Sequence, residues 1–185
     1  MLKHRDMEDN QLVKNCLEGR MEDFKLIMDR YTGKAMAMAI NILGSREDAE
    51  DVCQDVFIRV FHNLERFDPH KKFKDWLYAI LYNRCMDILR KRTRFYKYFQ
   101  KTSGELKESQ RINDEEIKTS KELPQKFLLT LSPRERTALV LWANESYTGE
   151  EIGNVLNCSS STARVYLYKA RKKIKERLEE KNANL

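Results

Sequence analysis

Glycine and proline are scarce in this chain of 185 residues, which contains only 6 and 3 of them. A fold of many short strands needs these residues in its tight turns, so their scarcity argues against a β-rich protein. Purely apolar runs are also short: the longest, 35–40 and 138–143, hold six residues each, whereas a membrane-spanning helix needs about 20. The charged N-terminus contains no apolar secretion segment. We therefore expect a cytoplasmic protein without membrane insertion.

Cysteine and histidine are few and are not clustered. The four cysteines lie 37, 32 and 73 residues apart with no C-x-x-C pair, and the three histidines are dispersed. We therefore expect Cys16, Cys53, Cys85 and Cys158 to be reduced and mostly buried thiols rather than zinc ligands or a redox pair. The sequence predicts no metal and no cofactor.

Charge, by contrast, is abundant and unevenly distributed. Lysine and arginine number 35 against 29 acidic residues, a formal net charge of +6. Segment 66–94 holds 9 basic and 3 acidic residues, and segment 159–177 holds 7 and 1, so each carries +6 and the remainder sums to −6. One basic segment in each half of the chain is consistent with binding to nucleic acid.

Apolar residues recur at helical steps of three and four along most of the chain. The clearest run has eight such residues between Ala49 and Leu64, after Ser45, a predicted N-cap. Pro69 interrupts the pattern, a long helix resumes at Phe73, and from 95 to 122 the periodicity fades. These features predict an all-α fold of two small helical domains, 10–94 and 123–178, joined by a flexible linker over 95–122.

The C-terminal domain contains the pattern of a helix-turn-helix. Ser132 and Thr148 each stand three residues before a glutamate and predict capping boxes. A short helix follows Thr148, Asn157 suits the left-handed turn after it, and Ser160 is expected to cap a longer helix. The inward stripe of that helix comprises Ala163, Leu167, Ala170, Ile174 and Leu178.

The other side of the longer helix presents Ser160, Ser161, Arg164, Tyr168, Arg171, Lys172 and Lys175. Hydroxyls at a helix N-terminus can donate to phosphates and base edges, and cations neutralise phosphates or contact guanine. An ordinary solvated helix also collects cations near its C-terminus, because the helix dipole favours them there. The turn spacing and the helix lengths favour DNA binding over that alternative.

Aromatic residues are interleaved with the first basic segment, as a surface for single-stranded nucleic acid requires. Phe73, Trp76 and Leu77 have the spacing of core residues. The residues less typical of a core, and therefore available for stacking on bases, are Phe67, Tyr78 and Tyr82, followed by Phe95, Tyr96 and Tyr98. An ordinary helix surface is the alternative interpretation of this segment.

An acidic cluster opens the helix that follows Ser45 and comprises Glu47, Asp48, Glu50, Asp51 and Asp55. Carboxylates four residues apart can bind Mg²⁺, but acidic residues at a helix start are also favoured by the dipole. The sequence offers no phosphate-binding glycine loop and no opposing carboxylate helix. A face that docks on a basic protein surface is the favoured interpretation.

Taken together, these segments resemble bacterial sigma factors. Residues 48–61 (DAEDVCQDVFIRVF) resemble the region 2.2 helix, and 73–83 (FKDWLYAILYN) with 87–91 (DILRK) resemble regions 2.3 and 2.4. The stretch from 131–136 (LSPRER) through 169–173 (KARKK) is similar to region 4.2. With two such domains and a short linker, the chain resembles the extracytoplasmic-function (ECF, group IV) sigma factors.

The resemblance implies a transcription initiation factor that is not an enzyme and that directs core RNA polymerase to promoters. By the family pattern, docking on the β′ clamp helices falls to Asp51, Gln54 and Asp55. Capture of the −10 strand, duplex and single-stranded, falls to Phe67, Asp68, His70, Lys71, Lys72, Asn83, Arg84, Arg90 and Lys91. Reading of the −35 element, with docking on the β flap, falls to Ser160, Ser161, Thr162, Arg164, Tyr168, Arg171 and Lys172. The resemblance also implies an anti-sigma factor as a partner.

Some positions depart from the family pattern. The recognition helix opens with serines at 159–161, where the family commonly has proline, a small residue and glycine, and Val165 and Tyr166 replace a frequent Ser-Arg pair. The −35 sequence therefore stays open, and 1–9 and 179–185 match no pattern. Two other functions remain: a stand-alone helix-turn-helix regulator of duplex operators, and a metal-dependent enzyme built on the acidic helix.

Overall fold

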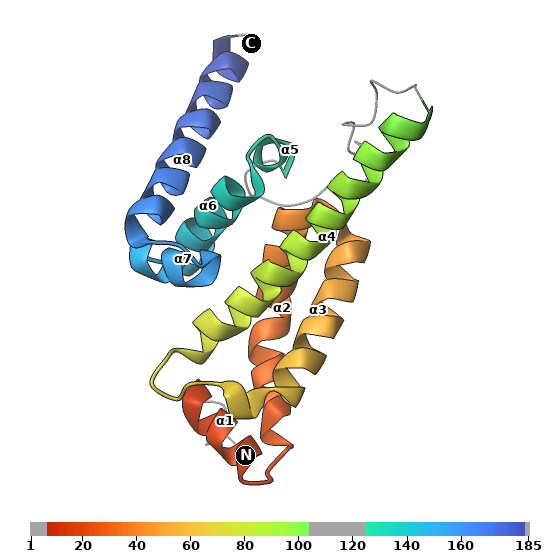
Figure 1. Ribbon diagram of the computed structural model, residues 1–185. Coiled ribbons are helices and arrows are strands. Elements are labelled where there is room, and N and C mark those ends of the chain that lie inside the picture. The colour runs from red at the N-terminus through yellow and green to blue at the C-terminus, as the bar shows by residue number, and fades with distance from the viewer. Residues whose placement is uncertain (1–6, 104–124, 184–185) are drawn as a thin grey trace.

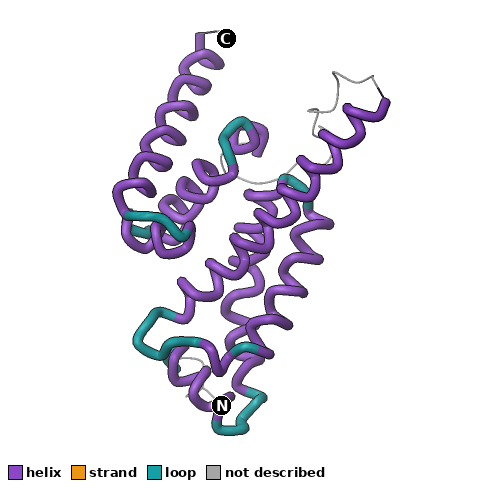
Figure 2. Tube along the Cα trace, viewed as in Figure 1, coloured by secondary structure: helices purple, strands orange, loops and turns teal. Residues whose placement is uncertain are grey.

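The computed structural model describes residues 7–103 and 125–183, and within these ranges the chain forms helices and loops only (Figure 2). This confirms the all-α prediction for the described residues. The first half holds α1 (Asp9–Leu17), α2 (Asp23–Leu43), α3 (Arg46–His62), the 3₁₀ turn η1 (Leu64–Arg66) and α4 (Phe73–Ser103). The second half holds α5 (Gln125–Leu129), α6 (Pro133–Glu145), α7 (Gly149–Leu156) and α8 (Ser160–Ala183).

The helix ends follow the predicted capping signals. Gly44 ends α2 in a left-handed conformation, with φ of 71°, and the Ser45 hydroxyl accepts a hydrogen bond of 3.2 Å from the Asp48 backbone. Ser132 and Thr148 form complete capping boxes with Glu135 and Glu151. At α8 the prediction is off by one residue, because the Thr162 N–H donates to the Ser159 hydroxyl, at 3.2 Å, rather than to that of Ser160.

The N-terminal half is a bundle in which α2, α3 and α4 run side by side and α1 lies across one end (Figure 1). Its core is built from the periodic apolar residues, with Ile27, Val56 and Leu77 fully buried. Ring contacts extend this core, since Phe24 meets Phe61 edge to face at 5.0 Å between centroids. The bundle thus fixes α3 and α4 relative to each other.

The cysteines behave as predicted. All four are free; Cys16, Cys53 and Cys85 are buried, and Cys158 is half-buried. Burial raises the pKa of Cys53 to about 11 and, with the nearby Cys53 thiol, that of Cys85 to about 12. These thiols are therefore protonated and unreactive at neutral pH.

The fourth helix is longer than the N-terminal domain that the sequence predicts. It runs for 31 residues to Ser103, so the predicted boundary at 94 falls inside it. The rest of the predicted linker, from 104 to 122, lies outside the described residues. No helix in 7–103 or 125–183 has the length and apolar character needed to cross a bilayer.

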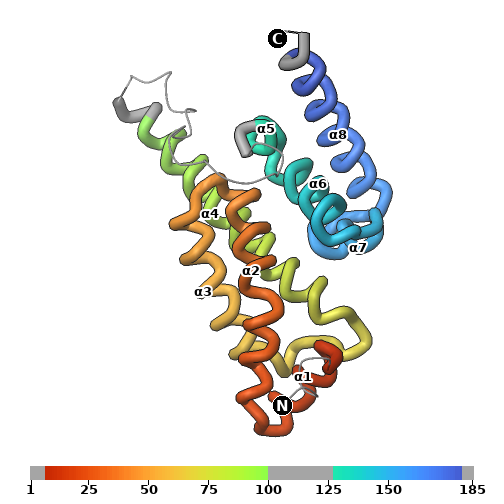
Figure 3. Tube along the Cα trace, turned by 180° about the vertical axis from the view of Figure 1, so that it is seen from behind, coloured from red at the N-terminus to blue at the C-terminus, as the bar shows by residue number. Residues whose placement is uncertain are grey.

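The two halves pack against each other, a contact that the sequence did not predict. α6 lies against α2 and α7 lies against α4 (Figures 1 and 3). Leu141 and Ile152 of the second half belong to the same buried cluster as Ile27 and Leu77 of the first. A smaller cluster around Leu139 and the inner face of α8 holds the second half together.

Candidate nucleic-acid interface

Helices α7 and α8 form the predicted helix-turn-helix. Asn157 adopts the left-handed conformation with φ of 51°, and the Cys158 N–H bonds back to the Gly153 carbonyl at 2.9 Å. A Cβ on Gly153 would lie 2.7 Å from the Cys158 carbonyl oxygen, so the tight turn requires glycine there. The turn places α8 across the end of α7 as a candidate recognition helix (Figure 1).

A cluster of hydroxyls opens α8. The Ser159 hydroxyl lies 2.9 Å from that of Ser161 and 2.8 Å from that of Thr162. Ser161 is exposed, whereas Ser160 and Thr162 are half-buried. Exposed hydroxyls and free N–H groups at a helix N-terminus suit phosphate oxygens and base edges.

Behind these hydroxyls the outer face of α8 carries the predicted cations. Arg164, Tyr168, Arg171 and Lys172 are exposed, and Tyr168 retains 68% of its surface. The Arg171 guanidinium lies over the ring of Trp142 on α6, 4.9 Å from its centroid, so its aim is set by another helix.

Two other residues on α8 differ from the sequence interpretation. Leu178, expected on the inward stripe, is 38% exposed, so the stripe ends at Ile174. Val165 is 48% exposed beside Arg164 and is an apolar residue on the DNA-facing side that the periodicity did not single out. A methyl-bearing side chain there can contact thymine methyl groups.

The loop between η1 and α4, residues 67–72, has an ordered turn. The Asp68 carboxylate accepts from the His70 N–H at 3.0 Å, and the Asp68 carbonyl accepts from the Lys71 N–H at 3.0 Å. The Asn10 amide of α1 donates to the carbonyls of Pro69, at 2.8 Å, and Lys71, at 3.2 Å. Asn10 therefore positions this loop from 59 residues away, a role without a local sequence signal.

Three aromatic residues expected to be available for stacking are buried. Phe67 is 6% exposed and packs on Phe73 and Trp76, at 5.6 and 5.4 Å between centroids. Tyr78 and Tyr82 are 1% and 4% exposed, because the second half of the chain lies over their side of α4. The exposed rings are instead those farther along α4: Phe95, Tyr96 and Tyr98.

The polar residues of α4 divide into paired and open groups. Asn83 and Lys91 are exposed, and Arg90 pairs with Asp87 at 3.0 Å. Arg84 is less available, since its Nε lies 2.7 Å from the Asp55 carboxylate of α3. That contact brings together one residue predicted for DNA and one predicted for protein docking.

The acidic helix α3 is partly neutralised by its neighbours. Asp48 pairs with Arg92, and Asp55 pairs with both Arg84 and Arg59, each at 2.7 Å. Asp51 and Gln54 remain exposed, and neither forms a side-chain hydrogen bond within the described part of the chain.

An apolar residue completes this face of α3. Ile58 lies one turn beyond Gln54 and is 59% exposed. Sequence reasoning missed it, although its position outside the inward pattern was the available signal. In 7–103 and 125–183 no three His, Cys, Asp or Glu side chains are grouped to hold a metal ion.

Comparison with known proteins matches both halves to one family. Residues 27–95 match the profile of sigma-70 region 2, and residues 125–174 match that of sigma-70 region 4. The chain is 30% identical over 183 residues to the ECF RNA polymerase sigma factor SigW of Bacillus subtilis, covering 94% of this chain and 98% of that protein. It is 27% identical to the ECF RNA polymerase sigma-E factor of Escherichia coli, covering 94% and 95%.

Solved structures show the same fold. The sigma factor RpoE of Bartonella quintana, crystallised with the anti-sigma factor NepR, superposes with a TM-score of 0.69 at 26% identity. That superposition covers 85% of this chain and 98% of the other. CnrH in complex with the cytosolic domain of CnrY superposes with a TM-score of 0.68 at 24% identity, covering 93% and 97%.

Proposed function

The chain belongs to the ECF RNA polymerase sigma factors, and from this we propose how its surfaces divide the work of transcription initiation. It is a sigma factor, which binds core RNA polymerase and directs it to promoters. Sigma factors in general are not enzymes, and we propose that this chain has no catalytic activity of its own. The first half is region 2 and the second half is region 4.

The α7–α8 unit carries the proposal for the −35 element. Its open hydroxyls and unpaired cations lie on one outer face, as a duplex-reading helix requires. The residues assigned to this contact are Ser160, Ser161, Thr162, Arg164, Tyr168, Arg171 and Lys172. Docking of region 4 on the β flap of polymerase is part of the same proposal.

For the −10 element we propose the loop 67–72 and the outer face of α4. Asn10 and Asp68 hold the loop in one conformation, which lowers the entropic cost of binding a strand. The assigned residues are Phe67, Asp68, His70, Lys71, Lys72, Asn83, Arg84, Arg90 and Lys91. Because Phe67 is buried, its role is to support the loop, and the exposed loop residues meet the DNA.

For core polymerase we propose the exposed face of α3, with Asp51, Gln54 and Asp55 on the β′ clamp helices. Ile58 adds an apolar contact at the end of that face. An anti-sigma factor is a further proposed partner, supported by the similar fold of RpoE in its complex with NepR.

Run-off transcription tests the proposed function. Purified core polymerase is incubated with the chain and a library of promoters, and we expect transcripts that depend on the added chain. Absence of every such transcript, together with absence of binding to core polymerase, would contradict the proposal. DNA binding without any effect on polymerase would instead identify a stand-alone regulator.

A further inference from the structure

The side of α4 that carries Tyr78 and Tyr82 lies beneath region 4. The ring of Tyr78 is 6.2 Å, between centroids, from the ring of Tyr147 in the turn between α6 and α7. Burial raises the pKa of the Tyr82 hydroxyl, and the nearby Arg134 guanidinium of α6 offsets this only in part. Both tyrosines are thus covered by residues of the second half, although they belong to the basic-aromatic helix of the first.

Three polar pairs hold this cover in place, and we name them the clasp. They join the start of α4 to the end of α6 and the start of α7: Lys72 to Glu151 at 2.6 Å, Lys74 to Glu145 at 2.7 Å, and the Tyr147 hydroxyl to Asp75 at 2.6 Å. The Lys74 ammonium also lies over the Tyr147 ring, 4.6 Å from its centroid. Charges of opposite sign therefore face each other along the contact.

The clasp occupies a residue proposed for DNA. Lys72 belongs to the loop 67–72, and its ammonium cannot neutralise a phosphate while it pairs with Glu151. A second tie lies farther along the contact, where the buried guanidinium of Arg136 donates to the Ile42 carbonyl at 2.7 Å. That carbonyl is in the last turn of α2, where the helix dipole favours a cation.

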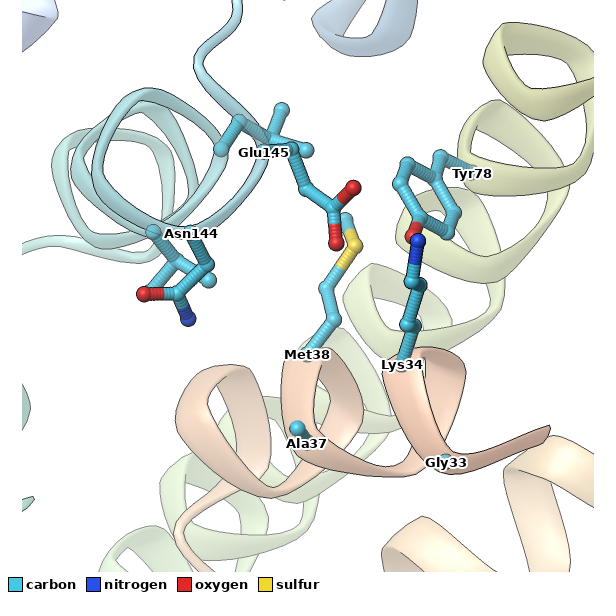
Figure 4. Close-up of a pocket in the computed structure, with 9 residues that line it drawn as sticks. Gly33, Lys34, Ala37, Met38, Tyr78, Asn144 and Glu145 are labelled. Carbon is cyan, nitrogen blue, oxygen red and sulfur yellow. The ribbon is translucent and has the colours of Figure 1, made fainter. Parts of the chain in front are cut away.

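The contact between the halves nevertheless contains open space. A hollow of about 300 Å³ separates α2, α4 and α6, and Figure 4 shows Lys34, Tyr78 and Glu145 around it. Domain cores are packed to the density of organic crystals, whereas contacts between domains are more polar and can part. A polar, incompletely filled contact is suited to opening.

Promoter geometry requires such opening. The −10 and −35 elements are separated by roughly 25 base pairs, which span about 85 Å of duplex at 3.4 Å per base pair. In the structure the loop 67–72 touches the start of α7 through the pair of Lys72 and Glu151. The two DNA-reading surfaces therefore cannot occupy both elements at once in this arrangement.

We propose that region 4 of the free chain acts as a cover for the Tyr78 and Tyr82 face of α4, and that this face binds single-stranded DNA once the clasp opens. The proposal rests on the proposed function. Core polymerase releases the cover by binding the two regions apart, so that the free factor has low affinity for strands and the bound factor has high affinity.

Reversing one clasp pair tests the proposal with residues not assigned to DNA. The variants are Lys74→Glu, Glu145→Lys and the two combined, in the full chain. Small-angle X-ray scattering measures the radius of gyration, and fluorescence anisotropy measures binding to a dT oligonucleotide of about 12 nucleotides. Exposed positions supply charge-matched controls, Lys25→Glu and Glu150→Lys, and circular dichroism verifies that helix content is retained.

We expect each single variant to have a larger radius of gyration, and the combined variant to regain the compact value. Affinity for the oligonucleotide rises about fivefold in Lys74→Glu, because a larger fraction of molecules is open. This rise is diagnostic, since the substitution adds negative charge and Lys25→Glu weakens binding by charge alone.

Two results would overturn the proposal. One is an unchanged radius of gyration in both single variants, and the other is an expanded Lys74→Glu variant that binds the oligonucleotide no better than Lys25→Glu. Run-off transcription with core polymerase separates the two levels. If wild-type chain supports transcripts while either result holds, only the cover is wrong; if it supports none and does not bind core, the proposed function itself fails.

Discussion

Phe67 has a structural role that changes what its substitution reports. Its ring is 6% exposed and packs on Phe73 and Trp76 at the base of the loop 67–72. We therefore expect Phe67→Ala to lower the free energy of unfolding by about 3 kcal/mol, the low end for buried aromatic truncation. Urea denaturation measures this loss.

The matched control is Phe95→Ala, because the same ring is removed from a site that is 61% exposed. A change of less than about 0.5 kcal/mol is expected there. A small loss at Phe67, comparable to that at Phe95, would show that the ring does not support the loop in solution.

Glu151 reports the state of the clasp through its ionisation. Hydrogen bonds from Lys72 and from the Thr148 backbone lower its pKa to about 2, from 4.5. Because the folded pKa is the lower one, the stabilising contribution is complete above about pH 4.5 and is lost as the pH falls toward 2. The clasp is therefore insensitive to pH in the neutral range.

Removing the lysine should raise this pKa. In Lys72→Met the Glu151 value moves toward 4.5 but stays below it, since the bonds from Thr148 remain. Carbon NMR of the glutamate carboxyls follows the titration, and Lys71→Met is the control at a neighbouring exposed lysine. An identical Glu151 titration in both variants would mean that Lys72 and Glu151 are apart in solution.

At the scale of the elements, α3 separates a docking face from a structural one. Asp51 and Ile58 are exposed and are not tied to α4, whereas Asp55 is held by Arg84 and Arg59. We expect Asp51→Asn combined with Ile58→Ala to weaken core binding by about 2 kcal/mol, because contacts in the centre of an interface carry most of its energy. Stability should change by less than about 0.5 kcal/mol.

Surface plasmon resonance with immobilised core polymerase measures this loss. Glu65→Gln is the control, since it removes one exposed charge from η1, away from the α3 face. Normal core binding by the double variant would show that another face docks on polymerase.

Elements were predictable where their signals are local. The caps at Ser45, Ser132 and Thr148 depend on residues three positions away, so the sequence alone located those helix starts. The end of α4 was not predictable from periodicity, because its last described side chains, such as Phe95 and Tyr98, are exposed and leave no inward pattern. Among three consecutive serines at the start of α8, residue type could not identify the capping one.

At the scale of the whole molecule, the site was predictable only in its parts. The three surfaces lie on the elements that the motifs indicate, yet Tyr78 and Tyr82 are buried by a contact that no local pattern encodes. Tyr147 reaches Asp75 across 72 residues, and Lys72 reaches Glu151 across 79. Such pairs are selected by the packing of the two halves, which depends on surfaces rather than on periodicity.

The shared core has a thermodynamic consequence. Because Leu141 and Ile152 lie in one buried cluster with Ile27 and Leu77, melting of either half exposes apolar surface on the other. At low salt we expect a single calorimetric transition, with calorimetric and van't Hoff enthalpies equal. In Lys74→Glu the halves are uncoupled, so the calorimetric enthalpy should exceed the van't Hoff value.

Restoring the pair with opposite polarity tests whether this coupling comes from the clasp. Combining Lys74→Glu with Glu145→Lys returns attraction across the contact, so equality of the two enthalpies should return as well. At about 1 M salt the screening length falls to about 3 Å, which weakens the exposed pair of Lys72 and Glu151 more than the hydrogen bond from Tyr147 to Asp75. Two separate transitions in the wild-type chain at low salt would mean that the halves are already uncoupled without any substitution.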